Sequence, residues 1–260
     1  FGGFGEFKPI DSPKDRFWAD PFVISRNARH YVFVEELLFE LGRGRISCIE
    51  IGDNGEVLNS SIVLEKDYHM SYPLVFQHEG VDYMIPETKE NKTIDLYRCQ
   101  KFPDQWVFVR TLMTDVYAVD ATPYYYEGKW WLFANLDKVD GNSSINDELY
   151  LFYSGDLFFG NWVSHPQNPI VSDVKLARPA GKIFEENGKI FRPSQDCSLR
   201  YGYALNINRI TKLSEVEYEE VLERKIFPDW QPEIKRNHTI NSSSKATVVD
   251  AFKVRNRFGV

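Results

Sequence analysis

Four strand-like runs in this chain of 260 residues each begin at or just before a proline, and the prolines recur about every fifty residues. The four prolines are Pro21, Pro73, Pro123 and Pro179. A short turn and a second apolar or aromatic run follow each opening, and three of the turns hold Glu79-Gly80, Glu127-Gly128 and Asn187-Gly188. Such pairs supply the positive φ angles of tight hairpins. A repeat of about fifty residues that is built from hairpins predicts a β-propeller.

Each repeat continues with a third and a fourth strand, so that one repeat makes one blade. The third strands are expected at Ile46–Ile51, Ile94–Arg98, Glu148–Tyr153 and Tyr201–Ile207. The segment from His238 to Phe258 opens a fifth unit that is too short for a complete blade, and the run Phe4–Ile10 could lend its outer strand and close the ring. The sequence therefore predicts an all-β fold, a five-bladed β-propeller of four-stranded antiparallel blades.

We expect a single domain over residues 1–260, which could be excised from a longer protein. An open fragment whose remaining strands lie beyond Val260 is the alternative. A second point also stays open. The stretch from Leu213 to Leu222 has Ser214 and Glu217 at the spacing of a helix-capping box, yet it is equally suited to an outer strand.

Composition limits the partners. A formal charge of −7 argues against nucleic acid, because phosphate binding needs a basic surface, and it suits carbohydrate better. The apolar runs have strand length, so no transmembrane segment is expected. The three cysteines lack metal-ligand spacing, which predicts buried thiols and a cytoplasmic location, while several Asn-x-Ser/Thr sequons keep the secretory-pathway lumen as the alternative. We expect neither a cofactor nor a metal.

The channel mouth is the place where chemistry is expected. In a propeller the innermost strands line a central channel, so the starts of the proline-marked runs should converge there. These starts carry Asp20, Tyr72, Asp120 and Arg178, and the second strands end on Glu35, Glu36, Glu87 and Asp196. Paired carboxylates are the minimum for glycosidic chemistry, and crowding raises the pKa that a general acid needs. In the alternative, the aspartates only accept backbone hydrogen bonds in turns, and the glutamates are solvated.

Other residues near these positions suit the binding of a sugar. Trp18, beside Arg16 and Asp20, can stack on the apolar face of a sugar ring, or it can be ordinary core. The run Arg192-Pro193-Ser194-Gln195-Asp196 is polar where the matching strands are apolar, and such a departure marks functional candidates. His238 opens the fifth unit and could place an imidazole in the channel, although a lone histidine is often structural.

A string of motifs along nearly the whole chain resembles one known family. The motifs are Asp15-Arg-Phe-Trp-Ala-Asp-Pro-Phe, Tyr68-His-Met-Ser-Tyr-Pro, Ile85-Pro-Glu-Thr, Asp120-Ala-Thr-Pro, Ala177-Arg-Pro-Ala-Gly, Arg192-Pro-Ser-Gln-Asp and His238-Thr. The chain resembles the N-terminal domain of the glucosamine inositolphosphorylceramide transferase family, whose bacterial relatives occur in proteins of surface-polysaccharide assembly. More distantly it is similar to five-bladed furanosidase propellers such as glycoside hydrolase family 43. In those enzymes a first-blade aspartate is the general base, a third-blade aspartate tunes pKa and orientation, and a glutamate opening the fourth blade is the general acid.

The resemblance implies the first two hydrolase roles for Asp20 and Asp120, but the third role has no match. The fourth blade opens with Ala177-Arg178-Pro179, so the general acid is missing. A nucleotide or phosphate leaving group needs no such proton, and an arginine can stabilise its charge. This departure favours glycosyl transfer from an activated donor to a glycan or glycolipid in surface-polysaccharide biosynthesis over hydrolysis.

In this transferase hypothesis, Asp20 is the base or the nucleophile, and Asp120 is the partner that orients it. Arg178 and Arg192 hold the donor phosphate, while Asp196 and Glu87 bind sugar hydroxyls. Arg16, Trp18, Glu36, Tyr72, Gln195 and His238 complete the expected substrate site.

Two alternatives stay open. One is a furanosidase-like hydrolase in which Glu87, Glu36 or Asp196 replaces the missing acid. The other is a non-catalytic glycan-binding domain that assists a fused or associated transferase domain.

Overall fold

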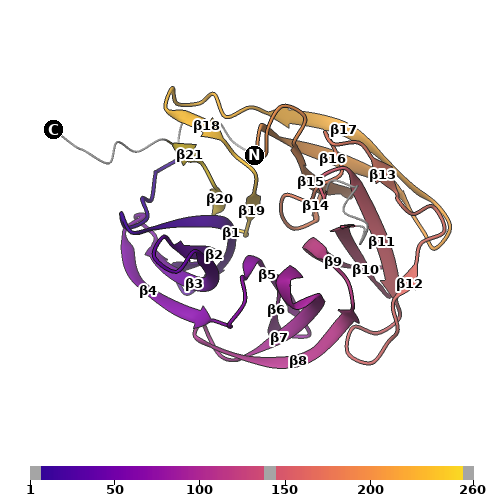
Figure 1. Cartoon of the computed structure of the whole chain (residues 1–260), viewed down its shortest axis with the longest axis horizontal. Coiled ribbons are helices and arrows are strands. Elements are labelled where there is room, and N and C mark those ends of the chain that lie inside the picture. The colour runs from indigo at the N-terminus through magenta and orange to yellow at the C-terminus, as the bar shows by residue number, and fades with distance from the viewer. Residues whose placement is uncertain (1–6, 138–144, 254–260) are drawn as a thin grey trace.

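A computed structural model describes residues 7–137 and 145–253, and its strands are arranged as sheets around a central axis (Figure 1). The first blade is the sheet β1-β2-β3-β4, with β1 (Arg16–Arg26), β2 (Arg29–Leu38), β3 (Arg43–Gly52) and β4 (Val57–Leu64). The second is β5-β6-β7-β8, with β5 (Ser71–His78), β6 (Val81–Thr88), β7 (Thr93–Lys101) and β8 (Gln105–Thr114), and a 3₁₀ turn, η2 (Lys89–Asn91), joins β6 to β7. In both blades chain order equals spatial order, as expected for a propeller meander.

The third and fourth blades follow the same plan with shorter edges. The third contains β9 (Ala118–Tyr126), β10 (Lys129–Leu136) and β11 (Glu148–Ser154), and two short strands, β12 (Val163–Ser164) and β13 (Val171–Ser172), pair with β11. The fourth contains β14 (Phe184–Glu186), β15 (Lys189–Asp196), β16 (Ala204–Leu213) and β17 (Tyr218–Ile226). The sequence-based strands agree with these positions in the first three blades. In the fourth blade, the run at Pro179 forms only an isolated bridge to Ser194, and the first strand, β14, begins at Phe184. The third strand of that blade begins at Ala204 rather than Tyr201.

The fifth position of the ring does not hold a four-stranded blade, so our prediction of five such blades is wrong and the structure has four. Two two-stranded sheets stand there instead, formed by β18 (Ile234–Arg236) with β21 (Phe252–Lys253) and by β19 (Ile240–Ser242) with β20 (Thr247–Val249). Each of these four strands has only two or three residues. The expected outer strand is not found in Phe7–Ile10, and Phe4–Glu6 and Val254–Phe258 lie outside the described residues.

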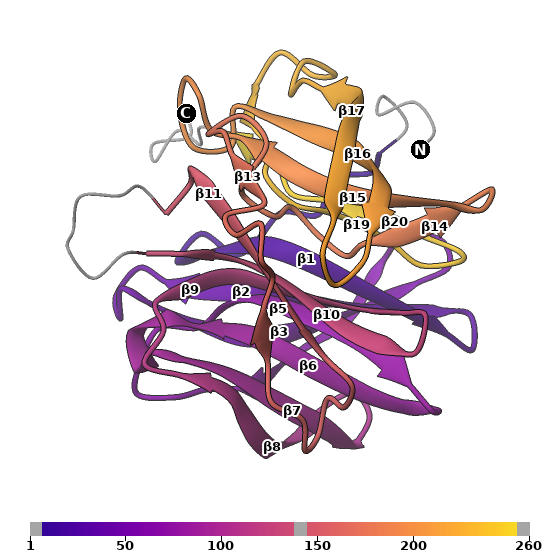
Figure 2. The ribbon, with the colours of Figure 1, turned by 90° about the vertical axis from the view of Figure 1, so that its right-hand side faces the viewer.

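Apolar side chains between successive sheets hold the ring together, and a view turned by 90° shows how these sheets are stacked (Figure 2). Between the first blade and the fifth position, Val32, Val34 and Ile49 pack with Ala246 and Val248. The ring therefore closes by side-chain packing, aided by a hydrogen bond from Asn241 Nδ2 to the carbonyl oxygen of Pro21 (2.8 Å).

Local backbone chemistry explains several details. The hairpin residues Glu79, Gly80 and Glu127 all have positive φ (49°, 77° and 49°), which confirms the expected tight turns. Gly181, at φ 140°, lies against β19, and a side chain has no room there: a Cβ would be 2.1 Å from the carbonyl oxygen of Ile240.

The stretch from Leu213 to Leu222 enters the outer strand β17 and is not a helix. Across the part of the chain that the structure describes, no helix has the length and apolarity needed to cross a membrane.

One backbone irregularity repeats in the first three blades. The inner strand carries a bulge two residues long, between Ala19 and Phe22, between Ser71 and Leu74, and between Val119 and Thr122. The first residue of each bulge is left-handed: Asp20 (φ 50°), Tyr72 (φ 42°) and Asp120 (φ 53°). A bulge bends its strand and re-aims a side chain, so three blades present an equivalent residue near the axis.

Candidate active site

The bulges bring acidic side chains from different blades together. Next to the first two bulges, Glu35 is paired with Ala19 and Glu87 with Ser71. We use the name acid centre for Asp20, Glu35, Glu87, Asp120 and Asp250 together with the cations Arg178 and His238. Asp20, Glu35 and Glu87 are acids of the centre with a raised pKa, and the charge of Asp120 contributes to each shift, which places these groups in one electrostatic neighbourhood.

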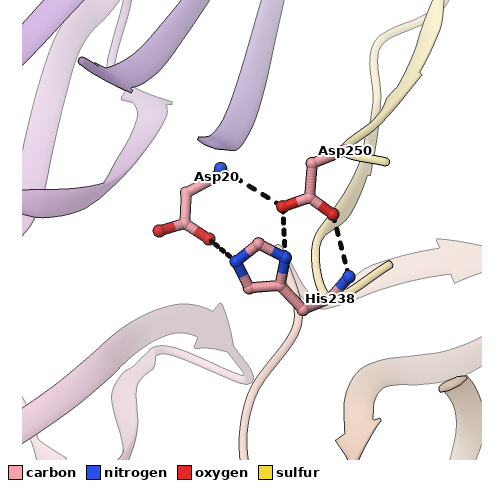
Figure 3. A group of neighbouring side chains, drawn as sticks. All are labelled: Asp20, His238 and Asp250. Carbon is pink, nitrogen blue, oxygen red and sulfur yellow. Dashed lines mark hydrogen bonds and ion pairs between the residues drawn. The ribbon is translucent and has the colours of Figure 1, made fainter. Parts of the chain in front are cut away.

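Asp20, His238 and Asp250 form a chain of polar contacts from β1 to the fifth position (Figure 3). His238 Nδ1 lies 2.5 Å from Asp250 Oδ2, and its Nε2 lies 3.4 Å from Asp20 Oδ1. The hydroxyl of Thr239 also donates to Asp20 Oδ1 (2.6 Å), and the backbone N–H of Tyr72 donates to Oδ2 (3.3 Å). Both oxygens of Asp20 are therefore held in place.

The charges of this group shift its proton affinities. Burial alone would lower the pKa of His238, but Asp250 and Asp20 outweigh it and raise the pKa to about 9. Burial raises the pKa of Asp20, an effect that His238 opposes and Asp120 strengthens. For Asp250, burial acts upward, yet His238 holds the pKa below its usual value. The group is thus an imidazolium between two carboxylates.

The same three residues place ligand-type atoms within 4.8 Å of one another. The 2.5 Å separation of His238 Nδ1 and Asp250 Oδ2 is that of a hydrogen bond. Two ligands of one ion stand about 3 Å apart in a tetrahedral site with bonds near 2 Å. The geometry therefore fits a hydrogen-bonded pair rather than a metal centre.

Asp120 and Arg178 form the second half of the acid centre. Arg178 Nε donates to Asp120 Oδ2 (2.6 Å), and Nη1 donates to Asn146 Oδ1 (2.8 Å). Gln195 Nε2 lies 3.4 Å from the same Asp120 oxygen. The guanidinium stacks on the ring of Tyr201, 4.8 Å from its centroid. Although burial acts against it, Asp120 raises the pKa of Arg178, so the cation is permanent.

The two glutamates are the least stabilised anions of the centre. Burial, with a contribution from Asp20, raises the pKa of Glu35 well above its usual range. Burial, followed by the charge of Asp120, raises the pKa of Glu87 to about 8, while Arg178 opposes the shift. His69 Nε2 lies 3.4 Å from Glu35 Oε1. Near neutral pH Glu87 therefore holds a proton that an ordinary glutamate has lost.

Tyr72 occupies the bulge of the second blade, and its side chain makes structural hydrogen bonds to other blades. Its hydroxyl contacts Thr122 Oγ1 (3.0 Å) and accepts a hydrogen bond from the backbone N–H of Gly181 (2.8 Å). The side chain is fully buried. It therefore links the second, third and fourth blades beneath the mouth.

Three predicted site residues gather in a separate cluster instead. Glu36 follows Glu35 on β2 and so points to the other face of the sheet. Its carboxylate accepts hydrogen bonds from Trp18 Nε1 (3.0 Å) and Arg45 Nη2 (2.8 Å), and Arg16 Nη1 lies 3.2 Å away. Burial acts upward, but these donors hold the pKa of Glu36 below its usual value. We call Arg16, Trp18, Glu36 and Arg45 the Glu36 cluster.

Arg192 and Asp196 also lie outside the acid centre. Arg192 forms a two-pronged pair with Glu220 (2.6 and 2.8 Å) and donates to the carbonyl oxygen of Leu176 (2.8 Å). Asp196 binds Lys225 Nζ (2.5 Å) and accepts from the backbone N–H of Ser198 (2.9 Å). Thus Asp20, Glu87, Asp120, Arg178, Gln195 and His238 are brought together, and Arg192 and Asp196 are not.

A cavity of about 670 Å³ lies beside the acid centre, between the first blade and the fifth position. Trp18 and Trp230 line it, and Asp250 forms the part of its wall that belongs to the acid centre. Aromatic rings with polar neighbours suit a sugar.

Sequence reasoning did not single out two residues of this region. Asp250 directly follows β20, much as Glu35 and Glu87 end the second-strand runs expected for their blades, so the blade pattern itself could have identified it. Tyr201, whose ring lies 5.0 Å from the ring of His238, comes from the loop before β16. A loop residue without a periodic position carries no comparable signal.

The comparisons with known proteins agree with this picture. A family model described as "Glucosamine inositolphosphorylceramide transferase 1, N-terminal" matches residues 10–250. Glucosamine inositolphosphorylceramide transferase 1 from Oryza sativa subsp. japonica is 38% identical over 208 residues, and the protein of the same name from Arabidopsis thaliana is 32% identical over 208 residues. These matches cover 79% of this chain but only 28% and 27% of the relatives. The chain thus spans little more than a quarter of their length.

Solved structures share the architecture at low sequence identity. The catalytic domain of the GH62 α-L-arabinofuranosidase from Coprinopsis cinerea superimposes with a TM-score of 0.70 at 13% identity, over 97% of this chain and 89% of that one. A family 117 glycoside hydrolase from Zobellia galactanivorans gives 0.64 at 10% identity, over 85% and 73%. At such identities the likeness shows an all-β propeller fold and nothing more.

Proposed function

The chain belongs to the family of glucosamine inositolphosphorylceramide transferase 1 N-terminal domains, and from this we propose that it takes part in glycosyl transfer. The donor is activated by a nucleotide or a phosphate, and the acceptor is a glycan or glycolipid of surface-polysaccharide biosynthesis. The relatives are much longer than this chain. We propose that this domain works together with a transferase domain, either fused to it in a longer protein or associated with it. The acid centre is the observation that carries this proposal.

Asp20 is the proposed base toward the acceptor hydroxyl. Thr239 and Tyr72 fix its two oxygens, and burial raises its pKa toward the range a base needs. Asp120 and Arg178 form a fixed pair beside it, and the arginine can stabilise negative charge on a leaving phosphate. The cavity lined by Trp18 supplies a surface on which a sugar can stack.

Nucleotide release tests the proposal. Wild type, Asp20→Asn and Asp53→Asn are incubated with a panel of nucleotide-sugars and mixed glycan acceptors, and free nucleotide is measured by mass spectrometry. We expect Asp20→Asn to lose about 10²- to 10⁴-fold of the rate, since it removes a general base. Asp53, with a side chain 64% exposed, is the matched control and its variant should turn over normally. Full activity in Asp20→Asn, with an unchanged circular dichroism spectrum, would remove Asp20 from this role.

Hydrolysis is the second candidate because Glu87 offers a protonated carboxyl group near neutral pH, with a pKa of about 8. This could replace the acid that is missing from the start of the fourth blade. Release of nitrophenol from a nitrophenyl arabinofuranoside or xyloside, without any nucleotide-sugar, would favour this reaction. Nucleotide release without nitrophenol release would favour transfer.

A further inference from the structure

The carboxylates of the acid centre differ in how completely their oxygens are bonded. Asp250 Oδ1 accepts from the backbone N–H groups of His238 and Thr239 (2.8 and 3.0 Å), and its Oδ2 faces the imidazole. Both oxygens of Asp20 are bonded, and Asp120 Oδ2 is bonded to Arg178. Among the described residues, no donor lies within hydrogen-bonding distance of the buried Oε2 of Glu87.

The two cations of the centre are already engaged. Arg178 is held by Asp120 and Asn146, and His238 lies between Asp250 and Asp20. An ionised carboxylate with a buried, unbonded oxygen would cost several kcal/mol. Five carboxylates share two cations, so they cannot all ionise easily. Glu87, with its unbonded Oε2, is therefore among the acids that keep a proton.

We propose that Glu87 supplies the proton-donating group of the acid centre and gives its proton to the oxygen leaving the sugar. This rests on the proposed function, in that it presumes glycosyl chemistry at this site. The leaving oxygen belongs to a glycoside or to a phosphate, and both accept a hydrogen bond from a neutral carboxyl group. A neutral Glu87 also lessens the repulsion that an anionic phosphate would meet among Asp20, Glu35 and Asp120.

For a glycosidic leaving group the step balances as follows. The bond between the anomeric carbon and the leaving oxygen breaks, its electron pair stays on that oxygen, and the Glu87 proton joins it. The attacking hydroxyl or water forms the new bond at the anomeric carbon and gives its proton to Asp20. Glu87 ends as a carboxylate and Asp20 as an acid, and solvent exchanges the protons back. For a phosphate leaving group the Glu87 proton stays in a hydrogen bond.

Infrared spectroscopy tests the proton itself without requiring turnover. The wild-type spectrum at neutral pH should contain a protonated-carboxyl band that weakens in Glu87→Gln. In Glu36→Gln the band should persist and carboxylate intensity should fall instead, since three basic or N–H donors keep Glu36 ionised. If Glu87→Gln removes carboxylate intensity and leaves the protonated band intact, the inference is wrong, whether or not the protein is a transferase.

Kinetics then distinguishes the two leaving groups. With nitrophenyl and alkyl glycosides, Glu87→Gln should lose about 10²- to 10⁴-fold for the poor alkyl leaving group and far less for the nitrophenolate. With nucleotide-sugars, Glu87→Gln should retain most activity, because the amide still donates a hydrogen bond, while Glu87→Leu should lose it. Equal rates for wild type and Glu87→Leu on every active substrate would overturn the role. Absence of any turnover, with the infrared result as expected, would instead count against the proposed function.

Discussion

Two buried charged regions of this propeller differ in how their charges are balanced. Around Arg192, one guanidinium meets one carboxylate through two hydrogen bonds, and a backbone carbonyl takes a third. In the acid centre, five carboxylates share two cations and one carboxylate oxygen has no donor among the described residues. Polar residues in a strand are thus of two kinds. A buried ion pair with balanced charges and complete hydrogen bonds stabilises the fold. A buried group with more carboxylates than cations still has hydrogen-bonding groups that a ligand can meet.

The largest expected effect comes from breaking the balanced region. Arg192→Met leaves Glu220 buried without its cation, and removing one partner of a buried pair costs about 3–5 kcal/mol. Urea unfolding followed by circular dichroism measures the loss. Arg209→Met breaks the partly exposed pair with Glu223 and serves as the control, with a cost below about 1 kcal/mol. Equal costs for the two variants would contradict the contrast.

The next effect is a pH dependence that belongs to the acid centre. Folding raises the pKa of Glu87 from 4.5 to about 8 and that of His238 from 6.5 to about 9, so the folded state binds extra protons. The free energy of unfolding should therefore be greatest below these ordinary values and fall as pH rises to about 9. Urea unfolding across this range measures the slope.

Glu87→Gln should flatten the lower part of that fall, between pH 4.5 and about 8. Glu36→Gln is the control, because the pKa of Glu36 is lowered and its carboxyl group in the folded protein does not titrate in this window. An unchanged slope in Glu87→Gln would show that the proton is not held by Glu87.

A smaller effect is expected at Lys182, an unbalanced cation in the interior. Burial lowers its pKa from 10.5 to about 8, and its Nζ makes one long contact, 3.5 Å to the carbonyl oxygen of Val23. Wild-type stability should rise as pH increases from about 8 to 10.5, because the unfolded chain holds the proton longer. Lys182→Met should lack this rise and should be more stable than wild type below pH 8. The exposed Lys175→Met is the control, and a destabilised Lys182→Met would show that the ammonium is better paired than its contacts indicate.

The smallest effect is expected in the Glu36 cluster. Trp18→Phe removes the Nε1 hydrogen bond to Glu36, but Arg45 and Arg16 still bind that carboxylate. The loss of one such bond with the acceptor still paired is worth about 0.5–1 kcal/mol. Thermal unfolding checks the value. A loss above about 2 kcal/mol would mean that Trp18 is a central packing residue of the first blade.

The sequence predicted the blades well because their signals are local. The pairs Glu79-Gly80 and Asn187-Gly188 specify hairpins, and a period of two shows which strand residues face inward. The prediction for the fifth position failed because its strands are too short to show a period. In addition, β21 pairs with β18 and not with β20, which precedes it in the sequence.

The candidate site was predicted in part for a related reason. Asp20, Asp120 and Glu87 sit at positions fixed by the repeat. The sequence analysis placed Glu36 in the substrate site, whereas the structure places Glu35 in the acid centre and Glu36 on the opposite face of the sheet. Which of the two adjacent residues faces the acid centre is set by the pairing across the bulge. Arg192 looked functional because its partner, Glu220, is 28 residues away on another strand. Such pairs become visible only after the chain is folded.

The repeated bulge has a consequence for how such a ring can change its chemistry. Strand pairing sets the left-handed backbone conformation at Asp20, Tyr72 and Asp120. The three positions are therefore structurally equivalent around one axis. Aspartate tolerates the left-handed conformation, whereas a tyrosine there is uncommon and adds strain of about 1 kcal/mol. A single substitution at one of these bulge positions would therefore change the reactive side chain and leave the backbone of the propeller unchanged.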